Sequence, residues 1–324
     1  AWPGCSRHYR AVLCSELKQP LAVEEVAPRP VGPHEVRVDV HFSGVNFADI
    51  LVCRGQYQEK PRLPFIPGVE FSGIVLETGR DVHTVKEGDR VIGLRRLNCM
   101  AGECIIDHKA LWQIPEGISL REAAVLPASY STAILALEHR ARTQPGETVL
   151  VTAAAGATGL AVIDVVTNVL QAKVIAAAGS EEKCKLAMQK GAQFSVNYSQ
   201  GSLKEALGKL VGSRGVDVAI DTVGGDVFLE ALRSLATGEA GGQQRGGRGH
   251  RHRGRRCLPG GSPQPGMGGQ DCGSGFCWRN HCFCAGQSSA PEEYLCHGDI
   301  RGPIPGPELS RLLQGPVLSN SVLP

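Results

Sequence analysis

The chain has 324 residues and a formal net charge of +2, and 42% of its residues are hydrophobic. A charge this close to zero argues against nucleic acid or a membrane surface as the main partner. The length predicts two domains, and the composition is typical of a soluble globular protein.

The first ten residues, AWPGCSRHYR, contain basic side chains but no acidic one, and they lack an initiator Met. This composition is typical of organelle presequences. We therefore treat residues 1–9 as a terminal segment and expect a mitochondrial or cytoplasmic protein. A cytoplasmic protein whose start is missing explains the pattern equally well.

Residues 10–125 contain short apolar runs that are separated by Pro and Gly residues. Val36, Val38 and Val40 alternate with charged residues, and this period of two is typical of a half-buried strand. The pattern predicts a compact antiparallel barrel. A helix is expected after it, over residues 120–141.

Between residues 126 and 236 the pattern changes to apolar strands that alternate with helices. Such alternation predicts a parallel sheet with helices on both faces. The apolar stretch 148–170 is interrupted by glycines and polar residues, so it predicts strand, turn and helix rather than a membrane span. The expected strands cover 148–154, 173–179, 195–200 and 216–223, and the expected helices cover 156–170, 180–191, 202–212 and 226–236.

A glycine-rich turn joins the first of these strands to the first helix. Gly156 and Gly159 are spaced G-x-x-G, with Ala157 and Thr158 between them, and Ala154 stands where such turns usually begin with a glycine. Backbone N–H groups at a helix start bind phosphate well, so we expect this turn to contact the pyrophosphate of a dinucleotide. The alternative is an ordinary tight turn.

The residues after the second strand distinguish between dinucleotides. NAD sites usually carry an acidic residue there, which binds the ribose 2′-hydroxyl. This chain has Ser180, followed by Lys183, and Tyr198 ends the next strand. A hydroxyl and a cation suit a 2′-phosphate, so the expected cofactor is NADPH. A solvent-exposed helix lysine is the alternative interpretation of Lys183.

Six motifs in this order resemble the quinone oxidoreductase branch of the medium-chain dehydrogenase/reductases, in particular its zeta-crystallin-like group. The resemblance covers roughly residues 10–236. The motifs are VNFADILVCRGQY, LPFIPGVEFSGIV, VKEGDRVIG, LVTAAAGATGLAVI, GAQFSVNY and VDVAIDTVGG.

The resemblance implies a GroES-like barrel domain (10–125), a Rossmann domain (126–236) and hydride transfer from NADPH to quinones or α,β-unsaturated carbonyls. It implies that Asn46 and Tyr57 lie near the nicotinamide and orient or polarise the substrate carbonyl. Without the resemblance, the same residues fit a turn former and a half-buried loop tyrosine.

The resemblance is to the zinc-free branch. Zinc-dependent relatives carry a G-H-E motif, and here the same place reads Gly68-Val69-Glu70, in which valine cannot bind a metal. The chain also lacks four closely spaced cysteines near residues 90–115. No metal site is therefore expected in this part.

Residues 237–324 have no apolar periodicity and contain six of the 12 cysteines, so we expect a disordered tail. The six cysteines before it are scattered, which predicts reduced thiols. The run DCGSGFCWRNHCFC at 271–284 lacks the paired C-x2-C spacing of structural zinc sites, and no zinc is expected there. The tract RGGRGHRHRGRR resembles RNA-binding arginine-glycine tracts, but nucleic acid is not expected as a partner.

Shifting the reading frame of possible codons for 269–299 yields an apolar strand, a glycine turn and an apolar helix, which resemble the segment that the family has here. We therefore interpret 268–324 as out-of-frame and 237–267 as inserted. This interpretation predicts a truncated Rossmann domain, the loss of the edge strand through which the family often dimerises, and impaired activity. The alternative function is a non-catalytic dinucleotide-binding remnant with a disordered basic tail.

Overall fold

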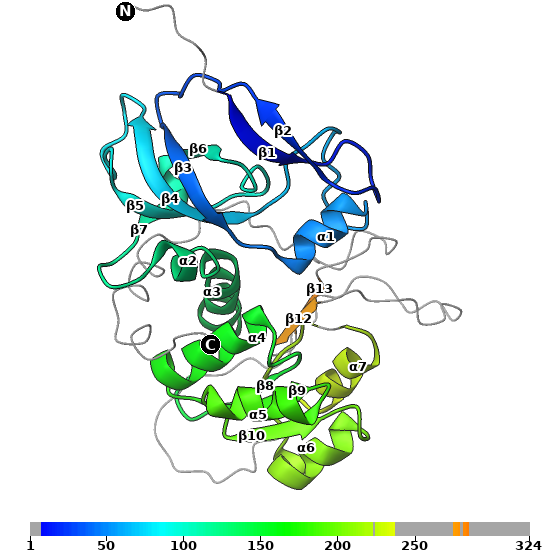
Figure 1. The fold of residues 1–324 in the computed structure, drawn as a ribbon. Helices are drawn as coiled ribbons and strands as arrows, with labels where there is room; N and C mark the ends of the chain where they lie inside the picture. Colours follow the sequence, from blue (N-terminus) through cyan, green and yellow to red (C-terminus); the bar gives the residue numbers. More distant parts are fainter. Residues whose placement is uncertain (1–7, 223, 237–274, 279–280, 285–324) are drawn as a thin grey trace, which may run out of the picture.

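The computed structural model describes residues 8–222, 224–236, 275–278 and 281–284 (Figure 1). Its first part is rich in antiparallel strands, and its second part is a parallel sheet surrounded by helices. Figure 1 shows the two parts stacked, with helices α2, α3 and α4 between the two sheets.

The first domain contains a two-stranded sheet and a five-stranded sheet in the order β6-β3-β4-β5-β7. On β3 (Glu35–Ser43), Val36 and Val38 are fully buried. Arg37, between them, forms ion pairs with Glu77 and Glu103. The predicted alternation is confirmed. The other elements are β1 (Tyr9–Leu13), β2 (Ala22–Val26), α1 (Phe47–Cys53), β4 (Glu70–Thr78), β5 (Arg90–Leu94), β6 (Glu103–Asp107) and β7 (Leu111–Gln113).

The helical stretch expected over 120–141 is present, but it is interrupted. The structure has α2 (Leu120–Ala123) and α3 (Pro127–Ile134), and wider π-helical turns continue α3 over Leu135–Ala141. Pro127 explains the break, because its ring removes a backbone donor and prevents the preceding turn from continuing through it. The proline instead occupies the first turn of a new helix, where a missing N–H costs nothing.

The second domain is a parallel sheet in the order β10-β9-β8-β11, which confirms the predicted strand and helix alternation. The elements end earlier than expected, but each one is present. The strands are β8 (Thr148–Val151), β9 (Lys173–Ala178), β10 (Phe194–Asn197) and β11 (Val218–Ile220), and the helices are α4 (Ala157–Asp164, with π-helical turns over Val165–Val169), α5 (Glu181–Gln189), α6 (Leu203–Val211) and α7 (Gly225–Arg233).

Both faces of this sheet are buried. On β8, Val149 and Val151 belong to the core on the α3 and α4 side, whereas Leu150 packs with Leu203 and Leu207 of α6. The first of these cores also contains Ile92 and Trp112 of the barrel domain. The two domains therefore share one hydrophobic core. Helix α3 lies beside α4 (Figure 1).

The tail contains a short antiparallel hairpin of β12 (Gly275–Trp278) and β13 (His281–Cys284). β12 contacts β11, next to the parallel sheet. The expectation that 237–324 has no regular structure is therefore wrong for these eight positions. The rest of that expectation lies outside the described residues.

Candidate functional site

The turn between β8 and α4 brings together the four residues predicted to contact a pyrophosphate. Gly156 is the N-cap of α4, and Ala157 and Thr158 begin its first turn. A Cβ atom on Gly159 would lie 2.5 Å from the carbonyl oxygen of Ala153, so only glycine lets the helix pack this closely. The N–H groups of a first helical turn have no acceptor within the helix, and they are free to bind phosphate oxygens.

Alanine fits where the common fingerprint has its first glycine. Ala154 is fully buried, and its N–H donates to the carbonyl oxygen of Ala177 on the neighbouring strand. The left-handed conformation of the turn falls instead on Ala153, with a φ of 44°. The turn therefore forms without a glycine at position 154.

The predicted 2′-phosphate residues also lie together, at the carboxyl ends of β9 and β10. Ser180 is the N-cap of α5, and its hydroxyl accepts the N–H of Lys183 at 3.3 Å. The ring of Tyr198 lies beside Gly179, at 3.4 Å from a Cβ built there. The side chain of Lys183 is exposed.

An acidic residue that sequence reasoning missed lies at the end of β11. Asp221 is fully buried, and its carboxylate accepts hydrogen bonds from the Thr152 hydroxyl at 2.6 Å and from the Gly224 N–H at 2.8 Å. These bonds join the ends of β8 and β11, where the direction of the chain crossover reverses. Ligands of doubly wound sheets bind at such a point. Burial raises the pKa of Tyr198, and the charge of Asp221 raises it further.

Asn46 is held at the start of α1 by two acidic residues. Its backbone N–H donates to Asp49 at 2.8 Å, and its side-chain Nδ2 donates to Glu70 at 2.7 Å. The second oxygen of Asp49 accepts the Gly68 N–H. Burial raises the pKa of Asp49, although both N–H groups oppose the shift. Sequence reasoning used Glu70 only as the end of a motif without a metal ligand, so its contact with Asn46 was missed.

Tyr57 lies beyond the other end of α1. It is half-buried and packs against Cys14, Val52 and Phe65. Burial raises the pKa of its hydroxyl, and the nearby charge of Glu59 acts in the same direction. Figure 1 places α1 on the side of the barrel domain that faces the parallel sheet. Within the described part of the chain, neither Asn46 nor Tyr57 hydrogen-bonds with the glycine turn.

Exposed apolar side chains flank Asn46, which sequence reasoning did not anticipate. Val45 is 74% exposed, Phe47 is 67% exposed and Ile50 is 41% exposed. An apolar surface around one polar group suits the binding of a flat, weakly polar molecule. In the sequence, the only indication of this surface was the apolar character of the residues on either side of Asn46.

Among the residues that the structure describes, no group of three or more His, Cys, Asp or Glu could hold a metal ion. Cys99 and Cys104 are both buried and hydrogen-bond with each other. This bond and the nearby Arg95 lower the pKa of Cys104 to about 7. No zinc was expected at 271–284, where the structure describes the backbone of 275–278 and 281–284 and the other positions lie outside the described residues.

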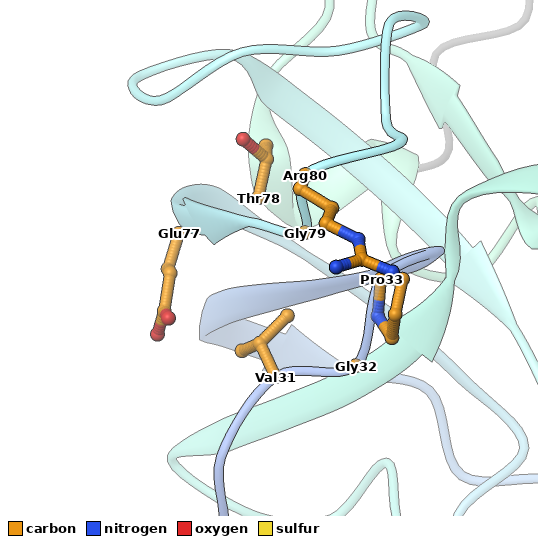
Figure 2. Close-up of a pocket in the computed structure, with 7 residues that line it drawn as sticks. All are labelled: Val31, Gly32, Pro33, Glu77, Thr78, Gly79 and Arg80. Atoms are coloured by element: carbon orange, nitrogen blue, oxygen red, sulfur yellow. The ribbon is translucent and has the colours of Figure 1, made fainter.

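Figure 2 shows a hollow in the barrel domain, lined by Val31–Pro33 and Glu77–Arg80. It contains none of the predicted site residues, so it does not contribute to the candidate site. No helix in the described residues combines the length and apolar character needed to span a membrane.

Two family models match the chain. The alcohol dehydrogenase GroES-like domain matches residues 32–136, and the zinc-binding dehydrogenase domain matches residues 157–241. The first match covers the elements from β3 to α3, and the second begins at Ala157, in the first turn of α4, and covers β9, β10 and β11. Together they confirm the predicted fold class of a GroES-like barrel joined to a Rossmann sheet.

Curated relatives match over much of the same length. Quinone oxidoreductase-like protein 2 of Bos taurus is 78% identical over 236 residues, which cover 73% of this chain and 68% of the relative. The Mus musculus protein of the same name is 77% identical over 236 residues, covering 73% and 67%. Quinone oxidoreductase of Rattus norvegicus is 34% identical over 219 residues, covering 67% and 66%.

Solved structures show the same fold. The Escherichia coli quinone oxidoreductase complexed with NADPH matches with a TM-score of 0.66 and 29% identity, covering 70% of each chain. The CurK enoyl reductase matches with a TM-score of 0.66 and 27% identity, covering 70% of this chain and 71% of that one.

Proposed function

The chain belongs to the quinone oxidoreductase family of the medium-chain dehydrogenase/reductases, and from this premise we propose that it transfers a hydride from NADPH to quinones or α,β-unsaturated carbonyls without a metal ion. Membership of the family makes the protein an oxidoreductase that binds a nicotinamide dinucleotide and a small quinone-type molecule. The choice of NADPH, the site residues and the zinc-free mechanism are the parts that we propose.

The turn between β8 and α4 carries the proposal. Its glycines allow the first turn of α4 to come close to a pyrophosphate, and its N–H groups supply the donors. Gly156, Ala157, Thr158 and Gly159 would hold the pyrophosphate. The buried bond between Thr152 and Asp221 keeps the neighbouring strand ends in register beside it.

The preference for NADPH is supported by what surrounds Gly179. An acidic side chain at position 180 would repel a 2′-phosphate, whereas Ser180 can donate a hydrogen bond to it. Lys183 is exposed one turn later and supplies a positive charge. The Tyr198 hydroxyl can donate a hydrogen bond to the same group.

On the barrel side, Asn46 and Tyr57 are the polar groups that we assign to the substrate. The Nδ2 of Asn46 has two hydrogens, of which Glu70 accepts one. The other can donate to a substrate oxygen and stabilise the negative charge that develops there. Val45 and Phe47 offer apolar surface for the substrate ring.

The bound cofactor supplies the hydride, so the protein must align two molecules and stabilise charge rather than provide a strong acid or base. Val69 removes the metal ligand that zinc-dependent relatives have at this place. The Tyr57 hydroxyl can donate a hydrogen bond to the reduced oxygen.

A second candidate is a dinucleotide-binding protein without catalysis. It is favoured by the matched length of 236 residues in a chain of 324, and by the end of the second family model at residue 241. We propose that residues 237–267 are inserted and that residues 268–324 are out of frame, so that the later sheet strands and the edge used for dimerisation are missing. A mitochondrial or cytoplasmic location remains part of the proposal.

Fluorescence titration of the full chain with NADPH and NADH tests the cofactor, and quinone reduction tests the activity. Tighter binding of NADPH together with quinone turnover supports the enzyme. Binding of NADPH without turnover supports the second candidate. Absence of binding to either dinucleotide contradicts both candidates.

A further inference from the structure

Glu70 is a buried carboxylate to which the proposed function assigns no role. It begins β4, and only 2% of its surface is exposed. Burying an ionisable group is costly unless hydrogen bonds compensate for the lost water. The partners of this carboxylate therefore indicate what the burial achieves.

Each oxygen of the Glu70 carboxylate accepts one hydrogen bond, and the two donors belong to different segments of the chain. Oε1 accepts the Nδ2–H of Asn46 at 2.7 Å, and Oε2 accepts the backbone N–H of Ala128 at 2.8 Å. Asn46 begins α1 in the barrel domain. Ala128 lies in the first turn of α3, which packs against α4, the helix that starts at the glycine turn.

The backbone leaves space for this carboxylate. A Cβ atom on Gly44 would lie too close to the Glu70 carboxylate, at 2.2 Å from Oε1, so any side chain at position 44 would displace it. The N–H of Gly44 also donates to the carbonyl oxygen of Glu70 at 3.2 Å. The local structure is therefore arranged around one position of the Glu70 side chain.

The Asn46 amide is held at both ends as a result. Asp49 fixes its backbone N–H, and Glu70 fixes its side-chain nitrogen. Because a carboxylate can only accept, the amide nitrogen must face Glu70, which excludes the flipped orientation of the side chain. In the flipped orientation, the Asn46 side-chain oxygen, which is an acceptor, would face Glu70 in place of the donor Nδ2.

We propose that Glu70 is a positioning residue, which holds the Asn46 amide in one orientation and ties that orientation to the start of α3. The proposal rests on the proposed function, in which Asn46 contacts the substrate. Glu70 itself would touch neither substrate nor cofactor. Its effect on hydride transfer would act through Asn46.

The test uses Glu70→Gln in the full chain. Glutamine has a single acceptor oxygen, so it cannot accept from both Asn46 and Ala128. Because the Ala128 N–H belongs to the backbone and cannot turn away, we expect Asn46 to lose its bond. The matched control is Glu77→Gln on the same strand, where the side chain is exposed and pairs with Arg37.

The first readout is hydrogen exchange of the Asn46 side-chain amide by NMR, with its signals identified by their loss in Asn46→Ala. We expect exchange of one Nδ2 proton to be about tenfold faster in Glu70→Gln and unchanged in Glu77→Gln. An unprotected Asn46 amide in the wild-type chain, or equal protection in Glu70→Gln, overturns the proposal.

The second readout is quinone turnover. We expect Glu70→Gln to lower kcat about tenfold, to leave the Kd for NADPH within about twofold, and to have no further effect in an Asn46→Ala background. A loss that adds fully to that of Asn46→Ala overturns the proposal, because it indicates a general structural role. If the wild-type chain shows no turnover but the exchange results hold, the proposed function fails and the positioning of Asn46 by Glu70 stands.

Discussion

The two sides of the candidate site are built in different ways. On the sheet side, the turn between β8 and α4 offers backbone N–H groups, and glycine at position 159 makes the close packing possible. On the barrel side, Asn46 is oriented by the side chain of Glu70, 24 positions further along the chain. Glu70 in turn accepts a hydrogen bond from the backbone N–H of Ala128, another 58 positions further on. The comparison teaches that the sheet side depends on close backbone packing within a short stretch of sequence, whereas the barrel side depends on contacts between segments that are distant in the sequence.

The largest effect is expected at Gly159, where the sheet side is least tolerant. A Cβ atom in Gly159→Ala would meet the Ala153 carbonyl oxygen at 2.5 Å and the Ala154 Cα at 2.8 Å. We expect a loss of about 3 kcal/mol in the free energy of unfolding and a corresponding loss of NADPH binding. Thermal melts and fluorescence titration measure the two effects.

The control is Gly208→Ala, in the middle of α6, where a Cβ atom meets nothing within 4 Å. Alanine favours helix more than glycine does, so this change should stabilise the chain by up to about 1 kcal/mol. Equal effects of the two substitutions would show that the close approach at Gly159 is not required.

A smaller effect is expected at Asp221, a buried side chain that joins two strand ends on the sheet side. Asp221→Asn keeps one acceptor oxygen for two buried donors, the Thr152 hydroxyl and the Gly224 N–H. One donor loses its acceptor, so we expect a loss of about 2 kcal/mol in unfolding free energy, measured by denaturant titration. Asp226→Asn, an exposed change in α7, serves as the control, and a loss of equal size there would contradict the role of the buried bonds.

A change in cofactor preference, without a change in folding, is expected for Lys183→Ala. Removing the exposed ammonium group should weaken NADPH binding about tenfold and leave NADH binding unchanged. Titrations with both dinucleotides measure the difference. Lys185→Ala, two positions along the same helix, is the matched control. If the substitution weakens the binding of NADPH and NADH equally, Lys183 does not recognise the 2′-phosphate.

The smallest effect is expected for the stability at acid pH, and it involves Glu35 of the barrel domain. Arg29 and the Gly32 N–H hold the pKa of Glu35 at about 2, below the ordinary 4.5. A depressed pKa contributes stability that is fully present above pH 4.5 and is lost as the pH falls toward 2. Glu35→Gln should therefore flatten the pH dependence of the melting temperature in this window. An unchanged pH profile would show that the Arg29 contact contributes little.

Much of the sheet side could be predicted from the sequence because its signals are local. Four apolar strands alternate with helices, and the glycine turn lies within a few residues of one strand end. The residues around Ser180 follow the next strand end in the same way. Asp221 could have been found by the same rule, since it is a polar residue directly after a buried strand.

The barrel side could be predicted only in outline. Asn46 and Tyr57 were assigned by family resemblance, and nothing near them in the chain indicates that Glu70 and Ala128 complete the arrangement. The helix over 120–141 was predicted without its interruption, because the apolar pattern continues through Pro127. Contacts between distant segments depend on how the segments pack, and the apolar periodicity of the sequence contains no information on this packing.

The break at Pro127 has an electrostatic consequence. A helix start carries a partial positive charge, which is concentrated on the N–H groups of its first turn. One uninterrupted helix from residue 120 would have had no helix start, and no such charge, at the Ala128 N–H that Glu70 accepts. Because the proline begins a new helix, the positive end of the α3 dipole lies at the Glu70 carboxylate. The interruption therefore lowers the cost of keeping a negative charge in the interior, between the two domains.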